Sequence, residues 1–236
     1  MATIDVVIPV YNEEHVLTQS VNTLRQFLEK NLPNQCTVVI ADNASTDKTW
    51  EIAQALSREH SDVAATHLDK KGRGRALRKA WLESTADIVS YMDVDLSTEL
   101  DAFPKLIQAI EDGYSIAIGS RLLRGSSVKR SFKRELTSRS YNFIIKAMFR
   151  TKFADAQCGF KALSSKATKE LVPLVKDHEW FFDTELLILA EQRGYRIREI
   201  PVAWVEDPDT RVVIFKTALD DLKGLLRLRF RTGLNQ

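Results

Sequence analysis

The chain has 236 residues, of which 44% are hydrophobic and 28% are charged, and its formal net charge at pH 7 is +2. This composition is typical of a globular protein with a substantial core, and the length suits one large domain or two small ones. A net charge this small excludes a general attraction to polyanions, so any anion-binding site must depend on local clusters of basic residues.

Cys36 and Cys158 are the only cysteines, and they lie far apart in the sequence. Two distant cysteines form neither a disulfide framework nor a metal-ligand spacing, which favours a reducing compartment. The N-terminal residues lack the pattern of a secretory signal, and no apolar run is long enough to span a bilayer. We therefore expect a cytoplasmic protein that meets a membrane, if at all, from the side.

The first half of the chain alternates short apolar runs with segments of helical periodicity. Apolar runs that end in polar turns predict strands, and apolar residues three and four positions apart predict helices. Thr46 or Asp47 is expected to cap the second helix. The predicted strands are residues 4–10, 37–41, 63–68, 88–92 and 115–119; the predicted helices are residues 13–30, 46–60 and 100–112, with a loop and helix over 72–84.

This alternation predicts an α/β fold with right-handed crossovers and a mainly parallel, Rossmann-like sheet flanked by helices. Ligands bind such sheets beyond the carboxyl ends of the strands. Three polar turns follow predicted strands, and they contain Tyr11-Asn12-Glu13, Asp42-Asn43 and Asp93-Val94-Asp95. We therefore expect these turns to form one site at one edge of the sheet.

The second half is less regular and contains a strongly basic segment. Residues 121–152 hold ten basic residues and one acidic residue, interleaved with aromatic and aliphatic side chains. Strands are predicted at residues 159–164 and 197–204, with a helix over 183–193 between them. We expect one catalytic domain over residues 1–210 and an amphipathic C-terminal helix over residues 211–236.

Several motifs, taken in order, resemble those of family 2 glycosyltransferases of the GT-A fold. Two later motifs resemble the polyprenyl-phosphate branch of that family, which includes dolichyl-phosphate mannose and glucose synthases. The family motifs are Pro9-Val10-Tyr11-Asn12-Glu13, Ala41-Asp42-Asn43-Ala44-Ser45-Thr46-Asp47, Asp93-Val94-Asp95-Leu96-Ser97 and Gly119-Ser120-Arg121; the branch motifs are Asp155-Ala156-Gln157-Cys158-Gly159-Phe160-Lys161 and Trp180-Phe181-Phe182-Asp183-Thr184-Glu185-Leu186.

The resemblance implies a nucleotide-binding role for the first two turns. The Pro9 to Glu13 turn, with Tyr11, would lie near the base and ribose, and Asp42 would hydrogen-bond the base. A carboxylate at a helix start opposes the positive end of the helix dipole, which is the alternative role for Glu13. Lys71 and Gly72 belong to a basic glycine-containing loop, which either packs beside the nucleotide or only starts a helix on a basic surface.

The acidic turn is the predicted metal site. Mg²⁺ and Mn²⁺ are hard cations that proteins hold with one or two carboxylates plus phosphate oxygens. The resemblance implies that Asp93 and Asp95 bind Mg²⁺ or Mn²⁺ together with the donor diphosphate. Ser97 stands where relatives carry a third oxygen ligand, and a hydroxyl is a weaker one. An ordinary polar turn is the alternative interpretation.

The resemblance also assigns Arg121, Arg134 and Ser138 to the phosphate of the acceptor. A guanidinium fork matches phosphate oxygens and keeps its charge. Asp183 is expected at the active site, where it would act as a base or orient a substrate, and its alternative is a helix N-cap. The alternatives for the basic segment are a solvated cationic face, an anionic membrane surface or, less favoured, a nucleic-acid site.

The C-terminal segment has the pattern of a basic amphipathic helix. Such a helix either lies in a membrane interface or packs onto the core or a second subunit. The predicted apolar stripe comprises Phe215, Leu219, Leu222, Leu226 and Phe230, flanked by Leu225 and Leu228.

The resulting prediction is an inverting, metal-dependent transfer of a hexose from a nucleotide sugar to a polyprenyl phosphate. The motifs at residues 157–161 and 182–186 resemble the glucosyl branch more than the mannosyl branch. This resemblance favours UDP-glucose over GDP-mannose as the donor. The alternatives are a glycosyltransferase with a soluble acceptor and a non-catalytic module that binds a membrane or nucleic acid. We expect peripheral contact with the cytoplasmic face of a membrane, a homodimer or a separate membrane subunit as partner, and no nucleic acid.

Overall fold

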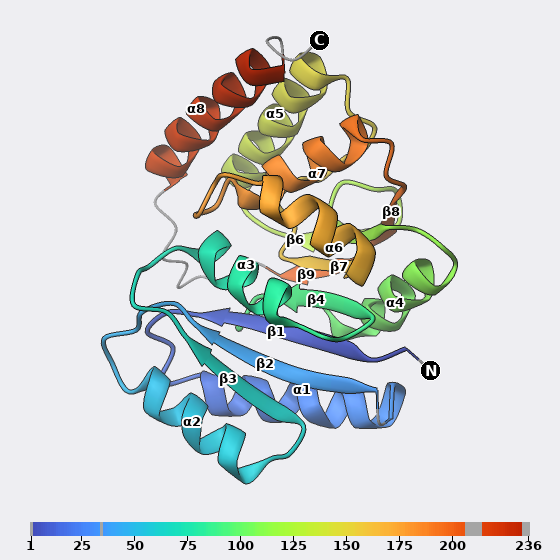
Figure 1. Ribbon diagram of the computed structural model, residues 1–236. Coiled ribbons are helices and arrows are strands. Elements are labelled where there is room, and N and C mark those ends of the chain that lie inside the picture. The colour runs from blue at the N-terminus through green and yellow to red at the C-terminus, as the bar shows by residue number, and fades with distance from the viewer. Residues whose placement is uncertain (1, 34, 206–213, 233–236) are drawn as a thin grey trace.

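The structure is a computed structural model that describes residues 2–33, 35–205 and 214–232. Its centre is a seven-stranded sheet of order β3-β2-β1-β4-β7-β5-β8, accompanied by a two-stranded sheet of β6 and β9 (Figure 1). The strands are β1 (Ile4–Val10), β2 (Cys36–Asp42), β3 (Val63–His67), β4 (Ile88–Met92), β5 (Ile116–Ser120), β6 (Ser127–Lys129), β7 (Phe160–Ser164), β8 (Ile197–Pro201) and β9 (Ala203–Val205).

Helices connect the strands and cover the sheet, as Figure 1 shows. The described helices are α1 (Leu17–Asn31), α2 (Thr49–Glu59), α3 (Arg73–Glu83), η1 (Leu100–Ala102), α4 (Phe103–Glu111), α5 (Phe132–Phe149), α6 (Ser165–Leu171), η2 (Val172–Leu174), α7 (Phe182–Gln192) and α8 (Ile214–Thr232). The expected C-terminal helix is thus present as α8. The expected domain boundary at residue 210 lies outside the described residues.

The expected mainly parallel sheet is confirmed, with one strand reversed. Strand β7 pairs antiparallel with both β4 and β5, whereas the other pairs in the large sheet are parallel. After β5 ends, residues 121–159 include helix α5, and β7 then begins beside the end of β5 and runs back. Periodicity does not reveal strand direction, so this reversal was not predicted.

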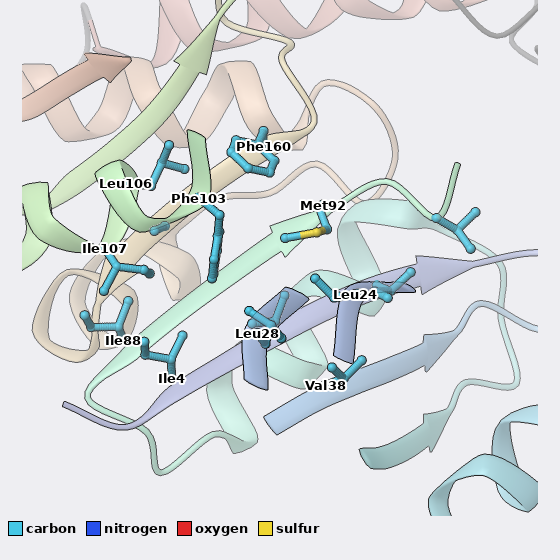
Figure 2. Packing of buried hydrophobic residues seen from close by; sticks show 14 of the residues in the cluster. Ile4, Leu24, Leu28, Val38, Ile88, Met92, Phe103, Leu106, Ile107 and Phe160 are labelled. Atoms are coloured by element: carbon cyan, nitrogen blue, oxygen red, sulfur yellow. The ribbon is translucent and has the colours of Figure 1, made fainter. Parts of the chain in front are cut away.

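The core consists of two apolar clusters on the two faces of the sheet. Side chains alternate between the faces of a strand, so Val6 and Ile8 belong to one cluster while Val7 belongs to the other. Figure 2 shows the first cluster, in which Phe103 of α4 packs edge-on against Phe160 of β7 with ring centroids 6.0 Å apart. The packing of this cluster holds β1, β2 and β4 in place, and these are the strands that lead into the polar turns.

Four predicted elements differ from the observed ones. Helix α2 begins at Thr49, and Lys48 rather than Thr46 or Asp47 occupies the N-cap position. Helix α1 begins at Leu17 rather than at residue 13, because Asn12 adopts a left-handed backbone conformation and the Glu13 amide is bound to Thr49 at the start of α2. The predicted helix over 100–112 begins with the 3₁₀ turn η1. The predicted strand over 197–204 divides into β8 and β9, which belong to different sheets.

Candidate active site

The turns that follow β1, β2 and β4 lie at one edge of the sheet. Parallel pairing places Val10 opposite Asp42 and sets β4 on the other side of β1. Hydrogen bonds also join the first two turns, since the Asn12 amide donates to Ser45 Oγ at 2.9 Å and the Thr46 amide donates to Asn12 Oδ1 at 2.8 Å. The expected polar edge is therefore present.

Glu13 lies between the first of these turns and the start of helix α1. Its amide donates to Thr49 Oγ1 at 2.7 Å, and its carbonyl accepts from Val16 and Leu17. Helix α1 has no acidic residue in its first turn. Because the Leu17 amide donates to the Glu13 carbonyl, one turn of helical hydrogen bonding precedes α1, and both roles of Glu13 stay predictions. Pro9 stands one residue before the end of β1.

Asp42 is fully buried at the end of β2. Its Oδ2 lies 2.6 Å from His67 Nδ1, and its Oδ1 has no hydrogen-bond partner among the residues that the structure describes. A buried polar atom without a partner carries a free-energy cost of about 1–3 kcal/mol. This oxygen therefore marks a position where a ligand could supply the missing donor.

The loop with Lys71 and Gly72 packs against the same turns. The Gly72 amide donates to Asn43 Oδ1 at 2.6 Å, and Lys71 Nζ lies 3.5 Å from the centroid of the Tyr11 ring. Gly72 is needed because its φ is +156° and an added Cβ would lie 2.7 Å from the carbonyl oxygen of His178. Gly72 also precedes helix α3, so the loop starts a helix, and its packing beside a nucleotide stays a prediction.

Asp93, Asp95 and Ser97 line one small pocket at the end of β4, together with Gly159. Asp95 Oδ1 accepts a hydrogen bond from the Ser97 amide at 3.0 Å. Gly159 makes room for the acidic turn, because an added Cβ would lie 1.8 Å from Asp93 Oδ2. The absence of a side chain at Gly159 therefore leaves room for the Asp93 carboxylate in the lining of this pocket.

The donor set of this pocket fits a hard divalent cation. Over the described part of the chain, there is no group of three or more His, Cys, Asp or Glu side chains that could hold a metal ion. A cation here would depend on Asp93 and Asp95 and on oxygens from a ligand or water. Mg²⁺ is commonly bound in this way, by one or two carboxylates and substrate phosphates.

Arg73 connects the acidic turn to Asp183. Its Nη2 lies 2.8 Å from Asp93 Oδ1 and its Nη1 lies 2.7 Å from Asp183 Oδ2. The guanidinium is buried, and it stacks 4.8 Å from the ring centroids of Tyr91 and Trp180. The structure thus joins two predicted site residues through an arginine that was not predicted.

Asp183 is buried within α7 and makes two further polar contacts. Lys161 Nζ lies 3.1 Å from its Oδ1, and the Tyr91 hydroxyl donates to the same oxygen at 2.6 Å. Burial alone would raise the pKa of Asp183, but Lys161 and Arg73 outweigh it and hold the pKa below its usual value. Its alternative as an N-cap is not observed, because Phe181 occupies that position.

Arg121 is held by a buried carboxylate. Its Nε and Nη2 lie 2.8 and 2.9 Å from the two oxygens of Asp155, and its amide donates to Asp155 Oδ2 at 3.0 Å. Burial favours the neutral acid, but Arg121 outweighs it and lowers the pKa of Asp155. Arg121 is therefore fixed in place immediately after β5.

Arg134 and Ser138 lie four residues apart on α5, and both are half-buried. Residues four apart on a helix lie on the same face, so the two side chains are neighbours. Their predicted contact with an acceptor phosphate stays a prediction, as does that of Arg121.

Helix α8 docks with one face and exposes another. Leu225 and Leu228 are buried, and Gln157 Nε2 donates to the buried Asp221 at 2.7 Å. Arg227 of α8 pairs with the buried Glu185 of α7 at 2.8 Å. The docked face thus holds the flanking residues of the predicted stripe.

The four stripe residues from Leu219 to Phe230 are exposed, whereas the Phe215 side chain lies outside what the structure describes. Helix α5 carries further exposed apolar side chains. Helices α5 and α8 run side by side (Figure 1). Phe143 is 72% exposed and Phe230 is 70% exposed. We call these side chains the α5–α8 apolar surface: Phe132, Leu136, Phe143 and Ile144 of α5, and Leu219, Leu222, Leu226 and Phe230 of α8. In the ranges that the structure describes, no helix is long and apolar enough to cross a bilayer.

The structure adds four polar residues that the sequence analysis did not select: His67, Arg73, Asp155 and Lys161. Arg73, Asp155 and Lys161 lie within segments that were singled out, but their partners are distant in the sequence. His67 lies within the strand predicted over residues 63–68, and it ends β3 opposite the predicted site residue Asp42.

Comparison with known proteins identifies the family. The model of glycosyl transferase family 2 matches residues 5–172. The chain belongs to this family. Its GT-A fold is also that of a glucosyl-3-phosphoglycerate synthase from Mycobacterium tuberculosis in complex with UDP, with a TM-score of 0.72, 21% identity and coverage of 97% of this chain and 80% of that one.

Two curated relatives place this family 2 chain more narrowly. It is 35% identical to the glycosyltransferase AglD of Haloferax volcanii over 95% of its own length, but it spans only 36% of that protein. It is 30% identical to a mouse dolichyl-phosphate beta-glucosyltransferase, over 98% of this chain and 76% of that enzyme. The resemblance to the dolichyl-phosphate branch is thereby confirmed.

Proposed function

We propose that this family 2 glycosyltransferase moves a hexose from a nucleotide sugar to a polyprenyl phosphate with inversion, and that UDP-glucose is its donor. The observation that carries the proposal is the position of Asp93 and Asp95 at the ligand edge of the sheet. The mouse relative, which aligns with almost the whole chain, is a dolichyl-phosphate beta-glucosyltransferase and so supports the lipid acceptor and the sugar.

The nucleotide would lie across the turns after β1 and β2. Asp42 offers the base an oxygen that has no partner among the described residues, and Tyr11 and Lys71, which contact each other, belong to the neighbouring turn and loop. Lys71 and Gly72 belong to the loop that is hydrogen-bonded to Asn43. These contacts would bind the donor and fix its orientation relative to the acidic turn.

Asp93 and Asp95, with Ser97 nearby, would hold Mg²⁺ or Mn²⁺, and the cation would offset charge on the departing diphosphate. Mn²⁺ with UDP in related structures of the fold supports a divalent cation. Arg73 keeps Asp93 in position and Asp183 keeps Arg73 in position. In this arrangement Asp183 acts through Arg73.

Arg121, Arg134 and Ser138 would hold the acceptor phosphate, whose oxygen attacks the anomeric carbon. A phosphate is already anionic near neutral pH, so the reaction needs no strong general base. The rigid Arg121–Asp155 pair suits this role, because a preorganised cation positions the nucleophile without reorganising during the reaction.

The α5–α8 apolar surface would rest on the membrane that carries the acceptor. Eight exposed apolar side chains on two adjacent helices exceed the scattered exposure that is normal for soluble domains. Basic residues such as Arg139, Lys146 and Lys223 accompany them and suit anionic lipids. We propose peripheral contact from the cytoplasmic side, as a homodimer or with a separate membrane subunit.

The decisive experiment incubates the purified protein with labelled UDP-glucose or GDP-mannose, a polyprenyl phosphate and Mn²⁺ or Mg²⁺. We expect label from UDP-glucose in the organic phase, and its loss on replacing Asp95 by alanine or adding a chelator. Asp112→Ala, an exposed acid outside the site, is the matched control. Failure of both donors to label the lipid would refute the lipid acceptor, and label on a soluble acceptor would support the alternative transferase.

Membrane contact is tested by flotation with vesicles that contain anionic lipid. Phe143→Ser combined with Phe230→Ser should reduce the bound fraction several-fold, because both side chains are largely exposed. Leu82→Ser, which changes an exposed apolar residue of α3 instead, should bind as the wild type does. Equal binding by the wild type, the double variant and Leu82→Ser would refute the proposal that the α5–α8 apolar surface contacts the membrane.

A further inference from the structure

We propose that His67 makes the base subsite select uracil over guanine by occupying one of the two oxygens of Asp42. The inference rests on the proposed nucleotide-sugar function and extends it to the choice of base. His67 would act as a specificity-determining residue through Asp42, without reaching the sugar or the diphosphate.

The two oxygens of Asp42 differ in their surroundings. Oδ2 lies 2.6 Å from His67 Nδ1, whereas Oδ1 has no partner within the described residues although the side chain is fully buried. A carboxylate only accepts hydrogen bonds, so His67 Nδ1 must carry the proton and donate it. One acceptor is therefore committed and one is available.

His67 is held firmly enough to keep this bond. It is the last residue of β3 and lies opposite Asp42 in the parallel β2–β3 register, and the following amide, of Leu68, donates to the Asp42 carbonyl at 3.0 Å. The His67 ring also packs against Trp50, with ring centroids 5.1 Å apart. Backbone pairing and ring packing together limit the rotation of the imidazole away from Oδ2.

The site for a base lies beside this carboxylate. Tyr11 follows Val10, which pairs with Asp42, and Lys71 precedes Gly72, which donates to Asn43. The Tyr11 ring and the Lys71 ammonium contact each other, so a planar base that enters here would displace or stack on this pair. Binding would give Asp42 Oδ1 the donor that it lacks.

Uracil and guanine present different donors to such a carboxylate. Uracil has one ring N–H, N3–H, between two carbonyl acceptors, so a single acceptor oxygen satisfies it. Guanine presents N1–H and its amino group side by side, and satisfying both requires both oxygens of a carboxylate. With Oδ2 bound to His67, the second donor of guanine must share that oxygen with the imidazole N–H, and a buried donor with a weakened hydrogen bond lowers the affinity for guanine relative to uracil.

The test measures UDP and GDP binding by calorimetry, with Mn²⁺ present, for the wild type and two variants. His67→Leu removes the donor, whereas His67→Asn keeps one, because Asn Nδ2 stands where His Nδ1 stands. We expect the wild type to prefer UDP, His67→Leu to reduce the UDP-to-GDP preference about tenfold, and His67→Asn to retain most of it. Circular dichroism establishes that both variants are folded.

The outcomes separate this inference from the function on which it rests. If UDP and GDP bind but the preference is the same in the wild type and in both variants, the role of His67 is refuted and the nucleotide site stands. If the wild type prefers GDP, the selection of uracil is refuted. If neither nucleotide binds the wild type, the proposed function fails and the role of His67 fails with it.

Discussion

Replacing Asp221 by asparagine should change how the stability of the protein depends on pH. Asp221 lies on the docked face of α8, it is buried, and it accepts a hydrogen bond from Gln157 at 2.7 Å. Burial raises the pKa of this carboxyl from 3.8 to about 6, although the hydrogen bonds from Gln157 and Tyr141 oppose the shift. The folded protein therefore binds the proton of Asp221 more tightly than the unfolded chain does.

The sign and size of the effect follow from this shift. A group that binds its proton more tightly in the folded state stabilises the fold at low pH, and this contribution is lost as the pH rises from about 4 to about 6. A shift of roughly two pKa units corresponds to about 3 kcal/mol. Asp221→Asn removes the ionisation and keeps an amide oxygen that accepts from Gln157.

Urea denaturation at a series of pH values from 3.5 to 8 provides the assay. Relative to the wild type, the free energy of unfolding of Asp221→Asn should rise by about 3 kcal/mol between the ends of this range. Asp220→Asn is the matched control, since Asp220 is exposed and pairs with Lys223 on the same helix. A difference between Asp221→Asn and wild type that stays constant with pH would refute the reasoning.

Three further substitutions test the packing around the site. Gly159→Ala places a Cβ 1.8 Å from Asp93 Oδ2, so it should lower the rate of hexose transfer roughly 100-fold; wild-type turnover would contradict this. Gly224→Val crowds Phe181, whose ring lies 2.5 Å from an added Cβ, and should cost about 1–3 kcal/mol in thermal unfolding. Arg73→Ala leaves two carboxylates without their shared partner and should cost about 3–5 kcal/mol in urea unfolding, with an unchanged midpoint as the contrary result.

The positions of the strands were largely predictable, because each strand is a short apolar run that ends in a polar turn. The first five predicted strands match β1 to β5 within about one residue at each end. Their parallel arrangement also followed from the intervening helices. The direction of β7 did not, because it depends on where residues 121–159 return to the sheet.

The residues at the strand ends were predictable for the same reason, but their partners were not. Asp42 ends β2 and Asp93 follows β4, and a strand end fixes the edge at which a side chain emerges. Arg73 is separated from Asp183 by 110 residues along the chain, and no spacing rule relates them. The same applies to Arg121, whose pairing with Asp155 depends on tertiary packing.

The apolar periodicity of helix α8 is compatible both with packing onto the core and with lying in a membrane interface, and the structure shows why. Its docked face carries Asp221 and Gly224 as well as leucines, because Gly224 must sit against the ring of Phe181 and Asp221 bonds to Gln157. The more regular apolar stripe points away from the core. Helices α5 and α7 contact α8, and within the described part of the chain the stripe residues from Leu219 to Phe230 are left exposed. An exposed apolar face on a helix whose other face is already docked indicates that a second surface covers it. We propose that this second surface is the membrane.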